Sequence, residues 1–263
     1  MSNNNTKEDN RKRLHVLYVG DTQTGHFLTS PGVGLYLSGG RMDESLHLRS
    51  ALGSDGAIEV THVASGEISE LLPVSARDFA LYDAIVLSDI TADTLLLYSD
   101  PKQMPPGPNR LNMIKEYVEN GGVLLMIGGW FSFGGFGGQA RYHGSPLEEV
   151  LPVVIKDGDD RKETPEGAGV KVLEPGHPVL TGLTAWDEVL FAGYNVLKAK
   201  PGSRVLLETD SGDPLLVITS WGKGTTCAFA SDCGPTWVGT MLSWAGYSKF
   251  WCRLIRFLVQ GKL

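Results

Sequence analysis

The amino-acid sequence predicts a single α/β domain built on a mostly parallel β-sheet. In the first half of the chain, short apolar runs rich in β-branched residues alternate with amphipathic segments, the pattern of parallel strands joined by right-handed crossovers. In the second half, strand-like runs follow one another across short turns, which favours antiparallel additions to the sheet. Because no stretch of the 263 residues resembles a linker, we expect one domain, residues 14–263, after a disordered polar tail, residues 1–13.

The elements of the first half can be assigned in order. Met42–Leu52, Ser75–Leu81 and Asn109–Asn120 are expected helices; the first has acidic residues in its first turn, and Ser and Asn cap the other two. The Gly-, Ser- and Thr-rich segment Asp21–Gly40 is expected to be a long loop, and the four prolines within Pro101–Pro108 exclude regular structure there. The expected core strands are Leu14–Val19, Ile58–Val63, Asp83–Ser88 and Val123–Ile127.

From Leu151 onward the sequence pattern predicts closely spaced strands instead of alternating strands and helices. Turns such as Lys200–Gly202 are short enough to join antiparallel neighbours. The chain closes with an amphipathic helix, Tyr247–Gln260, whose bulky apolar residues recur at helical spacing. The expected strands are Val170–Leu173, Val189–Ala199, Arg204–Thr209, Leu215–Trp221 and Thr225–Ala230.

The composition excludes several classes of function. With 30 acidic and 23 basic residues the formal net charge is −7, and phosphate-backbone binding needs clustered Lys and Arg, so we expect no nucleic-acid partner. No apolar run approaches membrane-spanning length, and Met1–Arg13 has no apolar signal region, so we expect no membrane association. Three cysteines without a C-x-x-C pair favour free thiols in a reducing, cytoplasmic setting.

The sequence also predicts neither a metal nor a cofactor. The six histidines show no pair at ligand spacing and no cysteine partner. Two glycine-rich pieces, Gly32–Gly34 and Gly135–Gly138, contain G-x-G but complete neither the dinucleotide nor the P-loop pattern.

The expected binding site lies where the parallel strands end, since ligands of open α/β sheets bind beyond the carboxyl ends of the strands. Three segments fit this rule: the loop after the first strand, the turn after the fourth, and the turn after the last core strand. Their polar and aromatic residues suit a pocket for a small polar molecule or carbohydrate, and equally a dimer interface. The residues that we expect to bind a ligand are Asp21, His26, Trp130, Arg141, Asp232 and Trp237.

Three residues are candidates for catalysis. Ser132 follows the fourth strand, but a G-x-S-x-G elbow would need glycine where Trp130 stands, which favours a structural hydroxyl. Asp232 can orient a histidine or bind a ligand, and it can equally cap the following turn. His143 is a candidate acid or base. Cys233 is interpreted as a buried, inert thiol, because nothing nearby in sequence would lower its pKa.

Six motifs occur in order along the chain. They are Gly128-Gly129-Trp130-Phe131-Ser132-Phe133, Ala140-Arg141-Tyr142-His143-Gly144, Glu149-Val150-Leu151-Pro152-Val153, His177-Pro178-Val179-Leu180-Thr181-Gly182-Leu183, Ser231-Asp232-Cys233 with Pro235 and Trp237, and Trp244 with Tyr247, Phe250 and Trp251. This set resembles the glutamine-amidotransferase-like family of bacterial cytoplasmic proteins. The resemblance extends from the first strand to the last helix and implies a flavodoxin-like three-layer fold related to class I glutamine amidotransferases and trehalose-utilisation-type proteins.

The same resemblance implies a Cys-His-Glu triad that this sequence lacks. A class I amidotransferase places its cysteine on the sharp turn, or elbow, after this strand, and here Gly128–Ser132 has none. The later strand end, Ser231–Cys233, has neither the histidine nor the glutamate, so all three parts of the thiol mechanism are missing.

Three functions therefore remain as hypotheses. The first is a glutamine amidotransferase-like protein without glutaminase chemistry that binds a small polar metabolite or carbohydrate. The second is a hydrolase or isomerase that uses Asp232 or His143 in the same pocket. The third is a structural role in which the aromatic residues of these strand-end segments pack against another copy of the chain in a homo-oligomer.

Overall fold

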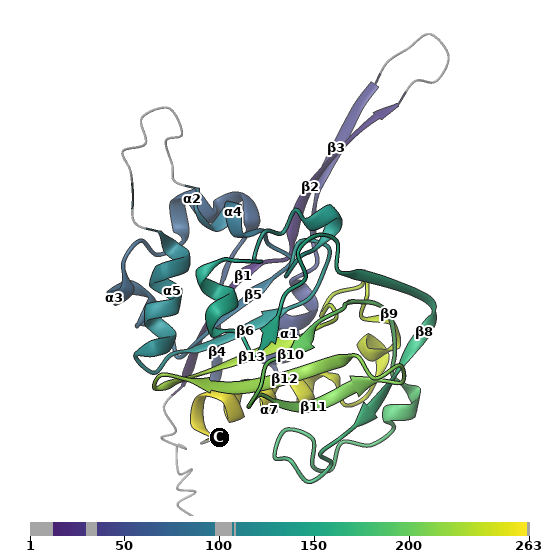
Figure 1. Cartoon of the computed structure of the whole chain (residues 1–263). Coiled ribbons are helices and arrows are strands. Elements are labelled where there is room, and N and C mark those ends of the chain that lie inside the picture. The colour runs from purple at the N-terminus through teal and green to yellow at the C-terminus, as the bar shows by residue number, and fades with distance from the viewer. Residues whose placement is uncertain (1–12, 30–35, 98–106, 108, 262–263) are drawn as a thin grey trace, which may run out of the picture.

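The computed structural model describes residues 13–29, 36–97, 107 and 109–261 and has a nine-stranded mixed sheet at its centre (Figure 1). Five neighbouring strands are parallel, and four further strands extend the sheet in antiparallel pairs. In spatial order the strands are β4 (Ile58–Val63), β1 (Leu14–Gly20), β5 (Ala84–Ser88), β6 (Val123–Ile127), β13 (Gly224–Phe229), β12 (Pro214–Trp221), β11 (Arg204–Thr209), β8 (Arg161–Val172) and β9 (Leu190–Asn195).

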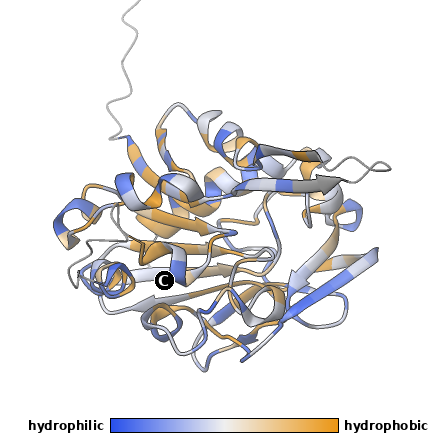
Figure 2. Ribbon diagram, turned by 90° about the horizontal axis from the view of Figure 1, so that it is seen from above, coloured by the Kyte–Doolittle hydropathy of each residue, from blue (hydrophilic) through white to orange (hydrophobic). Residues whose placement is uncertain are grey.

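Helices cover both faces of the parallel part of the sheet. On one face α1 (Leu46–Gly53) and α7 (Tyr247–Gln260) pack against each other and against β4 and β13. On the other, α5 (Arg110–Glu119) packs on β6 and β13 and against α3 (Ala76–Phe79) and α6 (Pro146–Val150). Figure 2 shows the hydrophobic strands enclosed between these layers. The predicted flavodoxin-like three-layer α/β fold is therefore confirmed.

Shorter elements complete the chain. Among the described residues, no helix has the length and apolarity that crossing a membrane requires. The short elements are α2 (Ile68–Leu71), α4 (Ala92–Leu95), β7 (Val153–Val154), β10 (Lys198–Ala199) and the 3-10 helices η1 (Ser65–Glu67), η2 (Phe136–Gly138), η3 (Trp186–Glu188) and η4 (Gly239–Ser243).

Most predicted elements are present where the sequence indicates them. The four predicted core strands are β1, β4, β5 and β6, with ends that agree within one residue, and they are parallel as expected. The predicted helix caps are also present: the Asn109 side chain accepts hydrogen bonds from Leu111 N–H and Asn112 N–H, and Ser75 caps α3. The expectation for Pro101–Pro108 lies outside the described residues, apart from residue 107.

The prediction of a long loop at Asp21–Gly40 is wrong. Its described residues form strand β2 (Thr22–Thr29), which pairs antiparallel with β3 (Tyr36–Asp43) over eight residue pairs. This two-stranded hairpin extends away from the body of the molecule (Figure 1). Because such a ribbon is not covered by the core, it has no apolar run to reveal it. The hairpin also shifts the start of the next helix: Met42 belongs to β3, and α1 begins at Leu46 instead of Met42.

The second half also corrects the sequence assignment. The strand expected at Thr225–Ala230 as an antiparallel addition is β13, which pairs in parallel with β6. The chain reaches this place only after it has formed the outer strands, and strand order in space is not visible in sequence order. Val170–Leu173 is the end of the longer β8, whose earlier part is polar, and Val189–Ala199 divides into β9 and β10.

Gly20, which ends β1 and precedes Asp21, gives a test of the fold. Its φ is +110°, and a Cβ there would lie 1.9 Å from the carbonyl oxygen of Ser88. We expect Gly20→Ala to lower the free energy of unfolding by ~3 kcal/mol, from backbone strain plus overpacking. Urea unfolding is the measurement, and Gly53→Ala, where an added Cβ meets nothing within 4 Å, is the control. Equal stability of the two variants would contradict this account.

Candidate functional site

The candidate site lies at the carboxyl edge of the parallel strands. β1, β5, β6 and β13 run in the same direction, so the residues that follow them meet at one edge of the sheet. Asp21 follows β1, Asp89 follows β5 and Asp232 comes shortly after β13, while β6 leads into a glycine-rich turn, residues 128–138, which we call the elbow loop. Asp21 and Asp89 both have left-handed backbone conformations, with φ of 51° and 43°.

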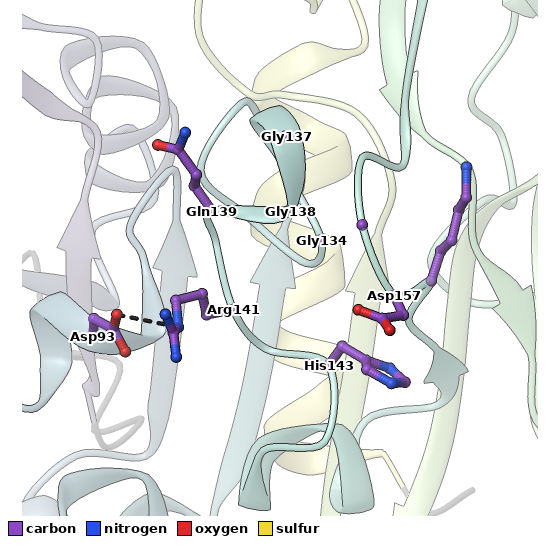
Figure 3. Close-up of a pocket in the computed structure, with 10 residues that line it drawn as sticks. Asp93, Gly134, Gly137, Gly138, Gln139, Arg141, His143 and Asp157 are labelled. Carbon is purple, nitrogen blue, oxygen red and sulfur yellow. Dashed lines mark ion pairs between the residues drawn. The ribbon is translucent and has the colours of Figure 1, made fainter.

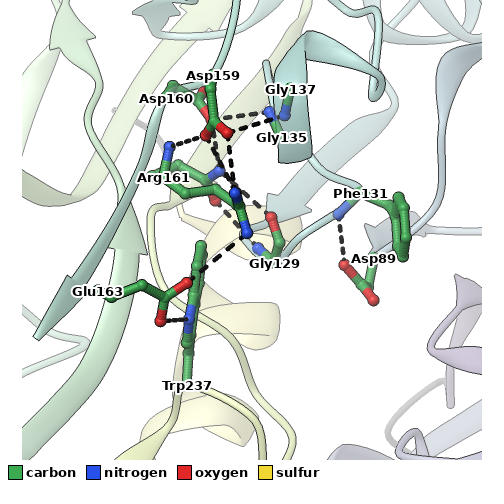
Figure 4. Close-up of polar contacts among 11 residues, drawn as sticks. Asp89, Gly129, Phe131, Gly135, Gly137, Asp159, Asp160, Arg161, Glu163 and Trp237 are labelled. Atoms are coloured by element: carbon green, nitrogen blue, oxygen red, sulfur yellow. Dashed lines mark hydrogen bonds and ion pairs between the residues drawn. The ribbon is translucent and has the colours of Figure 1, made fainter. Parts of the chain in front are cut away.

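The three aspartates form a buried carboxylate cluster. Asp21 and Asp232 are each 2% exposed and Asp89 is 7% exposed. Asp21 Oδ2 accepts hydrogen bonds from the Tyr18 hydroxyl and from Cys233 Sγ, whereas Asp21 Oδ1 is buried without a hydrogen-bond partner. Asp89 accepts from the Phe131 N–H at 2.7 Å (Figure 4) and from the Gln23 side-chain amide at 2.8 Å. Asp232 Oδ1 accepts from the Gly234 N–H at 2.8 Å.

Burial gives these carboxyl groups unusual proton affinities. It raises the pKa of Asp21 to about 6 and, together with the negative charge of Asp21, raises the pKa of Asp89 to about 7. Burial, with the charges of Asp21 and Asp89, raises the pKa of Asp232 well above its usual range. Near neutral pH the cluster therefore holds protons that ordinary aspartates have lost, and such groups can donate or accept a proton.

A buried hydrogen-bond network fixes the elbow loop. The Asp160 carboxylate, 1% exposed, accepts the N–H groups of Gly134 and Gly135 and the Nδ2 of Asn195, each at 2.8 Å. Asn195 Oδ1 in turn accepts the Gly129 N–H at 3.0 Å. The β8–β9 register pairs Arg161 with Asn195, which places Asp160 beside this amide. Together Asp160 and Asn195 hold the start and the middle of the loop, and we call this pair the clasp (Figure 4).

Ser132 lies inside the elbow loop and is fully buried. Its hydroxyl oxygen accepts the backbone N–H of Asp89 at 3.1 Å. The hydroxyl therefore joins the end of β5 to the turn after β6.

One side of the elbow loop lines a cavity of about 620 Å³ (Figure 3). Arg141, whose φ of 61° is left-handed, reaches it and pairs with Asp93 at 3.2 Å. His143 also lines it; its Nδ1 lies 2.9 Å from the Ile155 carbonyl oxygen and 3.4 Å from the Glu148 carboxylate. The lining residues are Asp93, Gly134, Gly137, Gly138, Gln139, Arg141, His143, Lys156, Asp157 and Gly158.

The structure separates residues that the sequence analysis expected to meet in one cavity. Arg141 and His143 do line a cavity together, whereas Asp21 and Asp232 belong to the carboxylate cluster. Trp237 is 1% exposed, and its Nε1 donates to Glu163 at 2.9 Å.

The two remaining predicted ligand residues lie elsewhere. Trp130 is 37% exposed and packs against Phe136 and Arg161. His26 is exposed on β2, in the hairpin that extends from the body. The prediction of one shared cavity is therefore wrong for Asp21, Trp130, Asp232 and Trp237, which are not part of the lining that Arg141 and His143 share.

Sequence reasoning missed several residues of this edge. Asp89 directly follows a predicted strand, so the rule that selected Asp21 would also have found it. The clasp had no such signal, because Asp160 and Asn195 come from the antiparallel half and reach the elbow loop only through the tertiary fold. Among residues 13–29, 36–97, 107 and 109–261, no cluster of His, Cys, Asp and Glu is arranged to hold a metal ion.

Comparison with known proteins gives a consistent result. Residues 15–260 match the family described as "Putative glutamine amidotransferase". Two solved structures of cytoplasmic proteins from Salmonella typhimurium are each 37% identical to this chain, with a TM-score of 0.88, covering 93% of this chain and 99% of theirs. A ThuA-like protein from Parabacteroides merdae shares the fold at 17% identity, with a TM-score of 0.57 and coverage of 96% and 92%. No curated protein matches the chain.

The pKa of Asp89 predicts how stability depends on pH. Because its folded-state pKa, about 7, exceeds the 3.8 of an ordinary aspartate, the folded protein keeps a proton that the unfolded chain loses, and stability falls as pH rises through this window. In the wild type, the titration of Asp89 should lower the free energy of unfolding by on the order of 3 kcal/mol between about pH 5 and pH 8. Asp89→Asn should abolish this contribution. Urea unfolding at both pH values is the measurement, with the exposed Asp187→Asn as control; an unchanged pH slope in Asp89→Asn would contradict it.

Proposed function

The chain belongs to the glutamine amidotransferase-like family, and from this premise we propose that it is a member without glutaminase activity that binds a small polar molecule at the carboxyl edge of its sheet. The observation that carries the first part is the elbow itself. Glutaminase chemistry needs a thiolate where backbone N–H groups can stabilise the oxyanion. At this turn the chain has Gly128, Gly129 and Trp130, and the nearby Ser132 is buried and hydrogen-bonded to the backbone of Asp89.

The cysteines support the same proposal. Cys227, Cys233 and Cys252 are all buried. Burial raises the pKa of each thiol, and the neighbouring charges of Asp21 and Asp232 raise that of Cys233 further. A reactive cysteine has the opposite environment, one that stabilises the thiolate.

The cavity beside the elbow loop supports the second part. Its volume of about 620 Å³ lies within the range of small-molecule sites. Arg141 and Lys156 offer donors, Asp93 and Asp157 offer acceptors, and Gln139 offers both. A lining of mixed charge suits a neutral molecule with many hydroxyl groups, such as a carbohydrate, better than a strongly charged one.

We further propose a cytoplasmic setting, in line with the two similar Salmonella proteins, which are described as cytoplasmic. The net charge of −7 supports a partner other than nucleic acid. A homo-oligomer remains the alternative use of the exposed aromatic residues.

The carboxylate cluster favours a second candidate function, an enzyme that uses acid–base chemistry. Asp21 and Asp89, with pKa values of about 6 and 7, have the proton affinities that a general acid or base needs near neutral pH. Asp21 and Asp89 are then the acid–base groups of this candidate, in place of Asp232 or His143, which the sequence analysis named. Burial raises the pKa of Asp232 well above its usual range, and His143 lines the cavity instead of the cluster.

The first test concerns glutaminase activity. We expect no enzymatic release of ammonia from glutamine by the wild-type protein, because no described thiol is activated at the elbow. Ser132→Ala and Cys233→Ala are assayed in parallel, with a class I amidotransferase as positive control. Turnover that either substitution abolishes would overturn the proposal and identify a replacement nucleophile.

The second test concerns the ligand. Native mass spectrometry of the protein purified from cells should detect a bound small molecule, and Arg141→Ala should lose it because the cavity then lacks its guanidinium. Arg77→Ala, on the exposed side of α3, is the matched control and should keep the ligand. A ligand retained by Arg141→Ala, or none in the wild type, would contradict binding in this cavity.

A further inference from the structure

Two exposed aromatic side chains lie side by side on the elbow loop. Trp130 is 37% exposed and Phe136 is 42% exposed. Their ring centroids are 5.8 Å apart, and the ring planes differ by 29°. The Phe136 N–H donates to the Trp130 carbonyl oxygen at 2.7 Å, so the backbone itself keeps the two residues together. Paired exposed aromatic rings on a fixed loop are typical of a binding surface.

A guanidinium group completes this surface. The Arg161 Cζ lies 5.1 Å from the centre of the Trp130 ring and 4.1 Å from that of Phe136. Asp159 binds this guanidinium with two hydrogen bonds, at 3.0 and 2.9 Å, and the Glu163 carboxylate lies 3.8 Å away (Figure 4). The cation is therefore fixed in place and its charge is compensated.

Glu163 supplies an accessible acceptor beside the rings. Its side chain is 53% exposed, and one of its oxygens accepts the indole N–H of the buried Trp237 at 2.9 Å. This bond fixes the carboxylate while leaving the group open to solvent. The surface thus combines an apolar face with planar polar groups at its rim.

The clasp makes the surface rigid before any ligand arrives. Asp160 and Asn195 hold the N–H groups of Gly129, Gly134 and Gly135, which flank the two aromatic residues in the sequence. A rigid surface loses little conformational entropy when a ligand binds, and this increases the affinity for a small ligand.

We propose that Trp130, Phe136, Arg161 and Glu163, together the aromatic platform, bind the apolar face of a pyranose sugar ring. This inference rests on the proposed function, since it names the class of small polar molecule. The C–H face of a pyranose packs on an aromatic ring, while its equatorial hydroxyls donate to the Glu163 carboxylate and accept from the guanidinium. Open-chain polyols lack the rigid C–H face. Nucleotides need an uncompensated cation for their phosphates, which Arg161 is not.

The platform adjoins the cavity of the proposed function. Phe136 belongs to the platform, and its neighbours Gly134, Gly137 and Gly138 line the cavity. Gly137 N–H donates to Asp159 at 2.9 Å, which ties the cavity side of the loop to the carboxylate that holds Arg161. A sugar on the platform therefore lies against the same loop as the proposed ligand site.

Saturation-transfer NMR with methyl β-D-glucopyranoside tests this inference directly. We expect transfer to the ring C–H protons of the glucoside, a decrease of at least about fivefold in Trp130→Ala, and retention in Trp130→Phe, which keeps an aromatic face. Leu81→Ala removes an apolar side chain that is 73% exposed elsewhere on the surface and should leave the transfer unchanged. Sorbitol and AMP, tested in the same way, should show little transfer.

Each other outcome has a definite meaning. Undiminished transfer in Trp130→Ala, or equal transfer to sorbitol and AMP, would overturn the platform. Loss of binding in Arg141→Ala with retention in Trp130→Ala would reject the platform while the cavity proposal stands. A gel-filtration shift to a smaller species in Trp130→Ala, without glucoside binding to the wild type, would show that the rings form a self-association contact instead.

Discussion

The buried carboxylate of Asp160 is the constraint on which the carboxyl edge of this protein depends. It satisfies two adjacent backbone N–H groups of the elbow loop and the side-chain amide of Asn195, which satisfies a third N–H, that of Gly129. Burial raises the pKa of Asp160, and these hydrogen bonds oppose that shift. A carboxylate that accepts hydrogen bonds in this position stabilises a loop that would otherwise leave several N–H groups buried without partners.

The glycines of the loop follow from the same constraint. A Cβ on Gly134 would lie 2.6 Å from the Gly158 carbonyl oxygen and 2.9 Å from the carboxylate carbon of Asp160, so a side chain there would push the clasp apart. Gly135 has a φ of +69°, which glycine adopts at little cost. The aromatic rings of Trp130 and Phe136 lie on the solvent side of this turn, because Asp160 and the backbone of Gly158 fill its inner side. In the proposed function, this turn presents rings and a cavity where an amidotransferase presents a nucleophile.

The sequence was sufficient for four of the five parallel strands, but not for the parallel pairing of β13 or for the parts that complete the site. Apolar runs such as Val123–Ile127 and capping residues such as Asn109 encode their structure locally, and the structure agrees with both. The β2–β3 hairpin carries no apolar run, and the polar start of β8 resembles a loop, so neither was visible. Asp21 and Asp232 were found because strand ends are recognisable, whereas the roles of Asp160, Arg161 and Glu163 arise from pairings between distant segments. The strand-end rule identifies an edge of the sheet, and side-chain packing then decides which residues share a cavity.

Backbone amide hydrogen exchange, measured by NMR on the wild type and on Asp160→Asn, tests the central claim most directly. The variant keeps the shape of the side chain but replaces an acceptor oxygen by an NH₂ donor that faces backbone N–H groups. The account predicts that the amides of Gly129, Gly134 and Gly135 lose protection, while those of the core strands, such as Val16 and Leu125, keep theirs. Unchanged protection of the three glycine amides would contradict it, because the elbow loop would then hold its position without the clasp.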